Sequence, residues 1–386
     1  MLIQNAKIVP VDIPDIERGY IRTAGDKITA LGPMSEAPQP DGSEPVIDGT
    51  GLTVYPGFVD IHCHVGMWED SLGQEGNDVN ETTDPCTPHL RGIDGLNPYE
   101  RPYLEAREGG VTSIVTGPGS ANAIGGQMAA VKTMGATVDR MIIQAPIAMK
   151  MALGENPKMS YGTRDRAPMT RMATAGIIRE QLMKTRRYIE DLEAGKHPAF
   201  DMKCEALIPV LKRELPVHIH CHRADDICTA IRLSKEFDLD TVLIHCTEGY
   251  KVTDQILEAG YPAVIGPIVF DRSKPELRDM RLFGAGRVDA AGVPMAICTD
   301  HPVIPIQYLP LTAGLAVRGG MDYRHALEAI TLRAAKIARI DGRVGSLTPG
   351  KDADILLCEG DPLSVYMRPK QLYIDGEPTL PDGWTL

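Results

Sequence analysis

Eight short apolar runs recur along the middle of this chain, and helical or loop-forming segments separate them. The runs cover residues 53–61, 111–116, 127–132, 142–151, 216–221, 241–246, 262–267 and 293–299. Several of the segments between them have the periodicity of helices, namely 176–192, 224–237 and 324–339. Strands that alternate with helices favour a parallel sheet, and eight such units are typical of a (β/α)8 barrel, the TIM barrel. We therefore expect an α/β fold with this barrel over residues 56–344.

The two ends of the chain have a different pattern from its middle. Residues 1–55 alternate apolar and polar side chains in short runs with turn residues between them, which is typical of antiparallel strands. The segment that begins at Gly345 repeats this pattern around a turn at Gly360-Asp-Pro362. We expect residues 1–55 and 345–386 to form one small β-sandwich domain that is split in the sequence.

The charge balance disfavours one class of partner. Of the 386 residues, 43% are hydrophobic, and 52 acidic residues outnumber 40 basic ones to give a net charge of −12. This balance disfavours nucleic acid, because phosphate binding needs concentrated Lys and Arg. We expect a small-molecule substrate instead, and the sequence leaves open whether the chain forms a homo-oligomer.

Cysteine usage and the absence of leader or membrane patterns point to one compartment. The eight cysteines show no C-x-x-C pair and no framework spacing, so we expect small buried thiols in a reducing environment. No apolar run reaches membrane-spanning length, and the N-terminus lacks the pattern of a secretory leader. We therefore expect a cytoplasmic protein with no membrane partner.

Two histidines stand two residues apart at the end of the first apolar run. His62 and His64 follow the run 53–61, and a strand repeats every two residues, so both rings should leave the same face. Imidazole is a common ligand of zinc and similar divalent ions. A pair on an exposed strand would look the same, so the rest of the chain decides between the two readings.

Four further polar residues stand at the ends of later apolar runs: Lys150, His220, His245 and Asp300. In a barrel the active site is built where strands end, so these side chains should converge with the first histidine pair on one mouth. Imidazole and carboxylate groups suit divalent metals, and this set can hold two ions if an anion bridges them. Lys150 can be that bridge only if carbon dioxide converts its amine into a carbamate. His218, in the same run as His220, is expected to pack outside the barrel.

These residues and two longer motifs resemble the amidohydrolase superfamily of metal-dependent hydrolases. The motifs are Pro56-Gly-Phe-Val-Asp-Ile-His-Cys-His64 and Gly345-Ser-Leu-Thr-Pro-Gly-Lys-Asp-Ala-Asp354, the second where the chain returns to its β-domain. The likeness spans nearly the whole chain. It is strongest to imidazolonepropionase-related and prolidase-like amidohydrolases, through Lys150-Met-Ala-Leu-Gly154 and His220-Cys-His222.

The resemblance implies a binuclear metal centre. Its first ion would be held by His62, His64 and Asp300, and its second by His220 and His245. The modified lysine, together with a hydroxide, would bridge the two ions. Zinc is the metal we expect first, and the same ligand types also suit manganese, cobalt and iron.

The resemblance also implies the reaction. Two divalent ions bridged by carboxylated Lys150 would activate water and polarise a carbonyl group. Asp300 would take the proton from the attacking hydroxide and return it to the leaving amine. We expect hydrolysis of a C–N bond in a small amide, peptide-like or cyclic amide substrate.

Three more residues are candidates for binding that substrate. His222 returns to the inner face two residues after His220, and Arg223 follows it, so both can meet a carboxylate or carbonyl group. Arg223 can equally belong to the start of the next helix. His301 directly follows Asp300 and can orient that carboxylate or the substrate, with a plain loop histidine as the alternative.

Two other functions stay open. A mononuclear deaminase or imidazolonepropionase-type hydrolase would lack the bridging lysine, and the deaminases rely on a glutamate after the fifth strand, where this chain has His-Cys-His-Arg-Ala-Asp over 220–225. A catalytically silent structural relative would typically have lost metal ligands, and none of the six is missing here.

Overall fold

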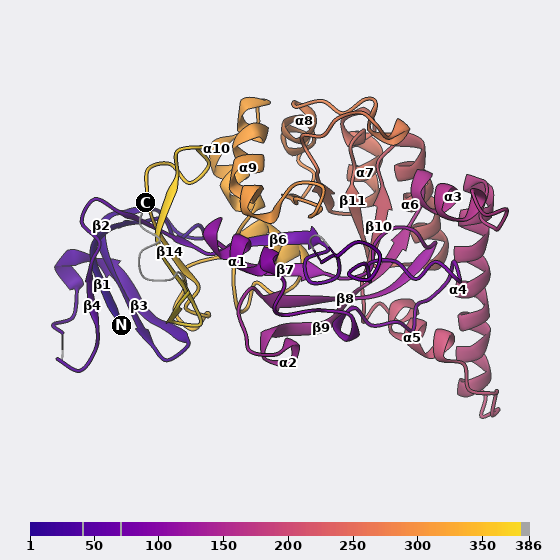
Figure 1. The fold of residues 1–386 in the computed structure, drawn as a ribbon, viewed down its shortest axis with the longest axis horizontal. Helices are drawn as coiled ribbons and strands as arrows, with labels where there is room; N and C mark the ends of the chain where they lie inside the picture. The colour runs from indigo at the N-terminus through magenta and orange to yellow at the C-terminus, as the bar shows by residue number, and fades with distance from the viewer. Residues whose placement is uncertain (41, 70–71, 380–386) are drawn as a thin grey trace.

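The computed structural model describes residues 1–40, 42–69 and 72–379 and consists of two parts that lie end to end (Figure 1). One part is a nearly closed barrel sheet with helices around it, and the other is a mixed sheet built from both ends of the chain. This confirms the expected α/β barrel with a terminal β-domain. The boundaries drawn at residues 55/56 and 344/345 stay a prediction, and 380–386 lies outside the described part.

The barrel sheet has eight strands in the order β13-β12-β11-β10-β9-β8-β7-β6. Each of the predicted apolar runs overlaps one of them. Their bounds in chain order are β6 Phe58–Cys63, β7 Val111–Thr116, β8 Ile124–Lys132, β9 Ile142–Ala152, β10 Val217–Cys221, β11 Thr241–His245, β12 Ala263–Ile265 and β13 Met295–Ile297.

One strand departs from the expected parallel order. β8 pairs antiparallel with both β7 and β9, whereas the other neighbours in the barrel are parallel. The reason lies in residues 117–123, which turn the chain straight back from β7 into β8 without a helix. At Gly117 a Cβ would lie 2.9 Å from the Cα of Met128, so glycine allows this close return.

The barrel closes between β13 and β6 through single contacts rather than a regular ladder. The main-chain N–H of Asp300 donates to the carbonyl of His62 at 3.1 Å. The buried carboxylate of Asp60 accepts from the N–H of His62 at 3.1 Å and from that of Thr299 at 3.2 Å. Burial raises the pKa of Asp60 to about 7. These contacts hold the ends of the first and last barrel strands together.

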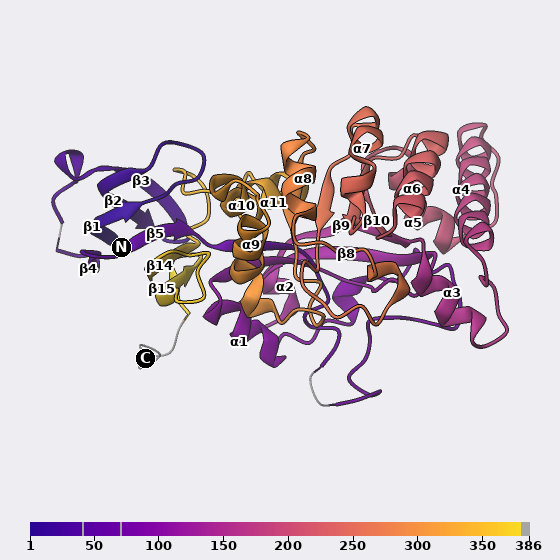
Figure 2. The same cartoon turned by 90° about the horizontal axis from the view of Figure 1, so that it is seen from above.

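Helices pack outside the barrel, and α4 stands at the end of the molecule farthest from the terminal sheet (Figures 1 and 2). Predicted helix 176–192 lies inside α4, and 224–237 coincides with α6. The third predicted helix, 324–339, is split into α10 and α11 at Thr331, whose hydroxyl donates to the Leu327 carbonyl.

The bounds of the helices are α1 Arg101–Glu108, α2 Val138–Met141, α3 Glu155–Gly162, α4 Arg171–Glu193, α5 Met202–Leu211, α6 Ala224–Phe237, α7 Thr253–Ala259, α8 Gly284–Ala290, α9 Leu309–Arg318, α10 Tyr323–Ala329 and α11 Leu332–Ile337. None of the helices in the described part combines the length and the apolar character needed to cross a membrane. The eight cysteines are free, and all but the half-buried Cys228 are buried, as predicted.

The terminal sheet joins the two ends of the chain. Its order is β16-β15-β14-β5-β1-β2-β3, with β4 on β1. β14, from the second segment, pairs antiparallel with β5 of the first. β1 pairs in parallel with β4 and β5, so the expectation of only antiparallel strands is wrong at these two pairs. The bounds are β1 Leu2–Ile8, β2 Ile16–Ala24, β3 Lys27–Pro33, β4 Val46–Asp48, β5 Thr53–Pro56, β14 Ile355–Glu359, β15 Arg368–Ile374 and β16 Glu377–Pro378.

A buried charge cluster joins the barrel to the terminal sheet. Lys132, the last residue of β8, places its Nζ 2.6 Å from Asp354, 2.9 Å from Asp352 and 3.2 Å from Asp375. Burial opposes the charged amine, but the three carboxylates together raise the pKa of Lys132 above its usual value. The motif that ends at Asp354 therefore serves the contact between the two parts of the molecule.

Candidate metal centre

The first group of candidate ligands lies where β6 and β13 end. Asp300 Oδ1 is 3.4 Å from His64 Nε2 and 3.6 Å from His62 Nε2. The ligand atoms of all three residues lie within 4.8 Å of one another, so the group could hold a metal ion. The structure therefore brings together the three residues predicted for the first ion.

The second group lies at the ends of β10 and β11. His220, His222 and His245 place their ligand atoms within 4.8 Å of one another, and all three are buried. The rings of His222 and His245 are stacked, with centroids 4.4 Å apart. The sequence predicts His220 and His245 as ligands but His222 as a substrate-binding residue. The structure places His222 beside the other two, and its role stays a prediction.

The backbone is unusual at two of these strand ends. Asp300 and His245 adopt φ angles of 56° and 76°, in a region that residues other than glycine rarely occupy. Such conformations persist only where the surrounding structure enforces them, and they cluster at functional sites. Here they aim two candidate ligands into the mouth of the barrel.

Main-chain carbonyls determine which ring nitrogen two of the histidines turn toward the site. His64 Nδ1 lies 2.8 Å from the Gly117 carbonyl, and His245 Nδ1 lies 2.7 Å from the Gly266 carbonyl. A carbonyl only accepts, so each Nδ1 carries a hydrogen and a neutral ring presents a bare Nε2. Burial lowers the pKa of His245 well below its usual value, so its ring is neutral at pH 7. Metal-binding histidines are commonly held from behind in this way.

Lys150 adjoins the first group. Its Nζ lies 3.1 Å from His62 Nε2, and its side chain is 0% exposed. Burial lowers the pKa of Lys150 to about 8, which leaves about a tenth of the amine neutral at pH 7. Burial and, after it, the charge on this amine lower the pKa of His220. The predicted lysine therefore meets the histidines inside the barrel.

Comparison with known proteins gives this arrangement a family. Residues 53–379 match the model of the amidohydrolase family. This chain belongs to that family. A solved amidohydrolase from Thermotoga maritima MSB8 is 38% identical, with a TM-score of 0.94, and the match covers 98% of this chain and 99% of that one. The resemblance inferred from the motifs is confirmed.

Two curated relatives extend the comparison. This chain is 29% identical to amidohydrolase tasK of Hapsidospora irregularis. The match covers 94% of this chain but only 39% of that relative. The chain is 24% identical to an imidazolonepropionase of Alkaliphilus metalliredigens, over 89% of this chain and 84% of the relative. The comparisons therefore establish the family and the fold.

His218 does not lie where the sequence analysis placed it. It pairs in register with Lys150 on the neighbouring strand and therefore shares the inner face of the barrel with that lysine. The expectation that it packs outside is wrong, because residues two apart in a strand, such as His218 and His220, point to the same side. Within the described residues neither ring nitrogen of His218 has a hydrogen-bond partner. Burial lowers its pKa to about 3.

The other two predicted substrate-binding residues make local contacts. Arg223 precedes α6 and forms two hydrogen bonds of 2.9 Å to Asp225, with 33% of its side chain exposed. His301 Nδ1 accepts from the N–H of Ile306 at 3.2 Å, so its Nε2 carries the hydrogen. The buried Nε2–H of His301 has no hydrogen-bond partner in the part of the chain that the structure describes. Both roles stay predictions, and His301 offers a free donor for one.

Sequence reasoning missed a carboxylate beside the second group. Glu276 Oε1 lies 3.4 Å from His220 Nε2 and 3.7 Å from His222 Nε2. The residue belongs to the 3₁₀ turn η4, Pro275–Leu277, in the loop after β12. No apolar run ends at Glu276, so the rule that located the other candidates could not find it.

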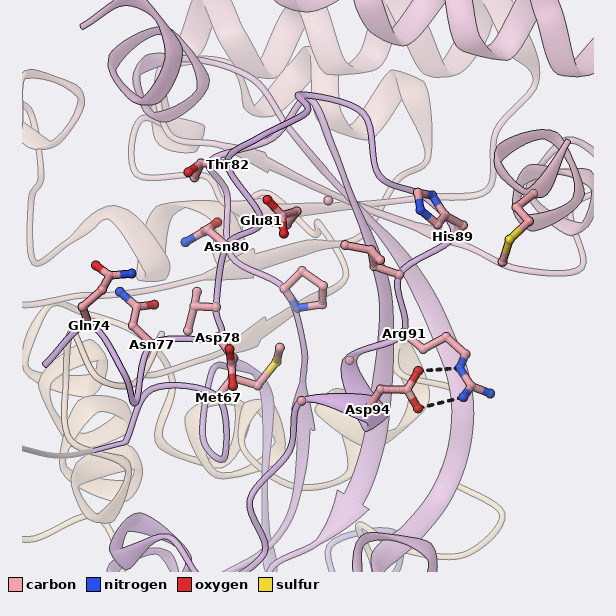
Figure 3. Close-up of a pocket in the computed structure, with 17 residues that line it drawn as sticks. Met67, Gln74, Asn77, Asp78, Asn80, Glu81, Thr82, His89, Arg91 and Asp94 are labelled. Carbon is pink, nitrogen blue, oxygen red and sulfur yellow. Dashed lines mark hydrogen bonds and ion pairs between the residues drawn. The ribbon is translucent and has the colours of Figure 1, made fainter. Parts of the chain in front are cut away.

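The structure also contains a cavity of about 940 Å³ (Figure 3). Its walls include Asn77, Asn80 and His89 from the long loop between β6 and α1. Pro118 and Gly125 line its other side. A Cβ on Gly125 would lie 3.5 Å from the Cγ of Lys150.

Proposed function

We propose that this amidohydrolase is a metal-dependent enzyme that hydrolyses a C–N bond in a small amide, peptide-like or cyclic amide substrate. The observation that carries the proposal is the meeting of two candidate ligand groups inside one barrel mouth. The groups adjoin, because the ring centroids of His62 and His245 are 5.1 Å apart. Family membership supports a hydrolase, and the histidine-rich groups support metal dependence.

The first group fits a divalent cation by its chemistry and spacing. His64 directs its Nδ1 at the Gly117 carbonyl and its Nε2 toward a carboxylate oxygen of Asp300, and a cation between Nε2 and that oxygen could be coordinated by both. Ligand atoms about 2.1 Å from a tetrahedral zinc ion lie about 3.4 Å from one another. The separations of Asp300 Oδ1 from His64 and His62, 3.4 and 3.6 Å, agree with this spacing.

We assign the ligands as follows. His62, His64 and Asp300 would hold one ion, and His220 and His245 the second. Bound divalent ions would polarise a substrate carbonyl and lower the pKa of water.

Lys150 would contribute the bridging anion. Carbon dioxide adds to a neutral amine with loss of a proton and gives an N-carboxylate. The low pKa of Lys150, about 8, favours this modification, because the neutral amine is the form that reacts. Without the modification the side chain offers no anion to bridge two cations, so the lysine is the feature that separates a two-ion site from a one-ion site.

The remaining residues would move protons and orient the substrate. Asp300 has 15% of its side chain exposed, so a substrate can reach its carboxylate, which would accept a proton from water and return it to the leaving nitrogen. The Nε2–H of His301 would donate to a substrate oxygen. His222 and Arg223 are the further candidates for contact with a substrate carboxylate.

Two measurements test this function. Purified protein would be analysed for metals and screened against N-acyl amino acids, dipeptides and cyclic ureides or imidazolones, with Asp300→Asn as the matched variant. We expect about two ions per chain in the wild type and at least a 100-fold lower kcat in the variant. Full turnover by Asp300→Asn would contradict the proton-transfer role.

The ion count also separates the alternatives. One ion per chain would favour a mononuclear deaminase or imidazolonepropionase-type enzyme. No ion after purification in metal-replete buffer would favour a catalytically silent relative.

A further inference from the structure

We propose that Glu276 is a ligand of the second metal ion, so that a carboxylate joins His220 and His245 around this ion. The inference rests on the metal-dependent function proposed above. It adds a ligand from the loop after β12, which supplies none of the other candidates.

The spacing around Glu276 repeats that of the first group. Oε1 of Glu276 is 3.4 Å from His220 Nε2 and 3.7 Å from His222 Nε2. The corresponding distances from Asp300 Oδ1 to its two histidines are 3.4 and 3.6 Å. In each group, the distance from the carboxylate oxygen to the two imidazole nitrogens is therefore about the distance between neighbouring ligands of a tetrahedral ion.

Glu276 and His220 have facing atoms without hydrogen-bond partners in the described part of the chain. Glu276 is 1% exposed, and within the described residues its Oε1 forms no hydrogen bond. Neither ring nitrogen of His220 forms one either. Buried polar atoms are rarely left unpaired in native proteins, and a buried carboxylate is costly unless a cation or donors compensate it. A divalent cation between Oε1 and the imidazoles would satisfy these atoms together.

The backbone holds Glu276 so that only one oxygen is free. Its Oε2 accepts from the main-chain N–H of Glu155 at 3.2 Å, and its own N–H donates to Oε2 of Glu155 at 3.1 Å. Gly154 permits this approach, because its φ is +80° and a Cβ there would lie 3.2 Å from Glu276 Oε2. This reciprocal pair anchors one oxygen and leaves the other directed at the histidines.

The experiment is a metal titration of chelator-stripped protein, with zinc in competition with a chromophoric chelator and cobalt(II) absorption as a second readout. Glu276→Gln keeps the size of the side chain and an oxygen that can accept a hydrogen bond, but it removes the charge. Glu155→Gln is the matched control, since it makes the same change next to Glu276. We expect two ions in the wild type and the control, and at least 100-fold weaker binding of one ion in Glu276→Gln.

Several outcomes overturn the inference. Wild-type affinity for both ions in Glu276→Gln would do so, because a residue that only hydrogen-bonds His220 tolerates the amide. Equal weakening in Glu155→Gln would assign the effect to the reciprocal pair. If Glu276→Gln does not fold, Glu276→Asp takes its place, because the shorter side chain keeps the charge but moves it away from the histidines. Unchanged metal binding by Glu276→Asp would also refute the role. A wild type that binds no metal would refute the proposed function itself, which separates the two failures.

Discussion

Replacing Lys132 by methionine tests the buried contact between barrel and terminal sheet. Methionine fills similar space but removes the charge that faces three carboxylates. Of these, Asp352 keeps Lys27 and Arg343 as partners, and Asp375 is 37% exposed and can be hydrated. Asp354, with 4% of its side chain exposed, has no other Lys or Arg partner among the described residues. The loss should therefore come mainly from one uncompensated buried carboxylate.

The buried charge of Asp354 determines how much free energy of unfolding Lys132→Met should lose. Removing one partner of a buried pair costs about 3–5 kcal/mol, and we expect about 3 kcal/mol in the free energy of unfolding, because one carboxylate rather than three loses its cation. Lys27→Met is the control, since Lys27 is 39% exposed and should cost at most about 1 kcal/mol. Urea unfolding followed by circular dichroism would measure both variants.

The loss in Lys132→Met should also depend on pH. Burial already raises the pKa of Asp354 above its usual value, and without the lysine it should rise further. A carboxyl group with a higher pKa in the folded state binds more protons when folded, so the free energy of unfolding increases as pH falls through that folded-state pKa. The reasoning would be refuted if Lys132→Met and Lys27→Met lost the same free energy of unfolding. It would also be refuted if the loss in Lys132→Met did not become smaller on acidification.

Further predictions concern the lysine of the metal centre and two glycines. At constant dissolved carbon dioxide, the rate of metal uptake by chelator-stripped protein should rise from pH 7 and level off above about pH 8. The reason is that carbon dioxide reacts with the neutral amine of Lys150, whose pKa is about 8. In Lys150→Arg the rate of metal uptake should show no such pH dependence. Gly117→Ala should destabilise the fold by about 1–3 kcal/mol in thermal unfolding, because its Cβ would clash with the β7–β8 hairpin. Gly176→Ala, in the open interior of α4, should instead stabilise it by about 0.5–1 kcal/mol.

Local patterns in the sequence were enough for the framework and for most of the site. The apolar runs identify all eight barrel strands, because burial on both faces of a strand is a property of the run itself. The strand ends then identify His62, His64, Lys150 and Asp300, which do meet in space. The period of two also predicts that His218 shares the inner face with His220, so its expected position outside the barrel was wrong for a reason visible in the sequence.

Only the tertiary structure decided which distant groups face each other. The direction of β8 depends on the tight return at Gly117. The spacing of apolar side chains along a strand does not indicate the direction in which the strand runs. Glu276 meets His220, and Lys132 meets Asp354, across separations of 56 and 222 residues. Such contacts depend on how strands and loops pack, and side-chain periodicity carries information only about the element to which a residue belongs.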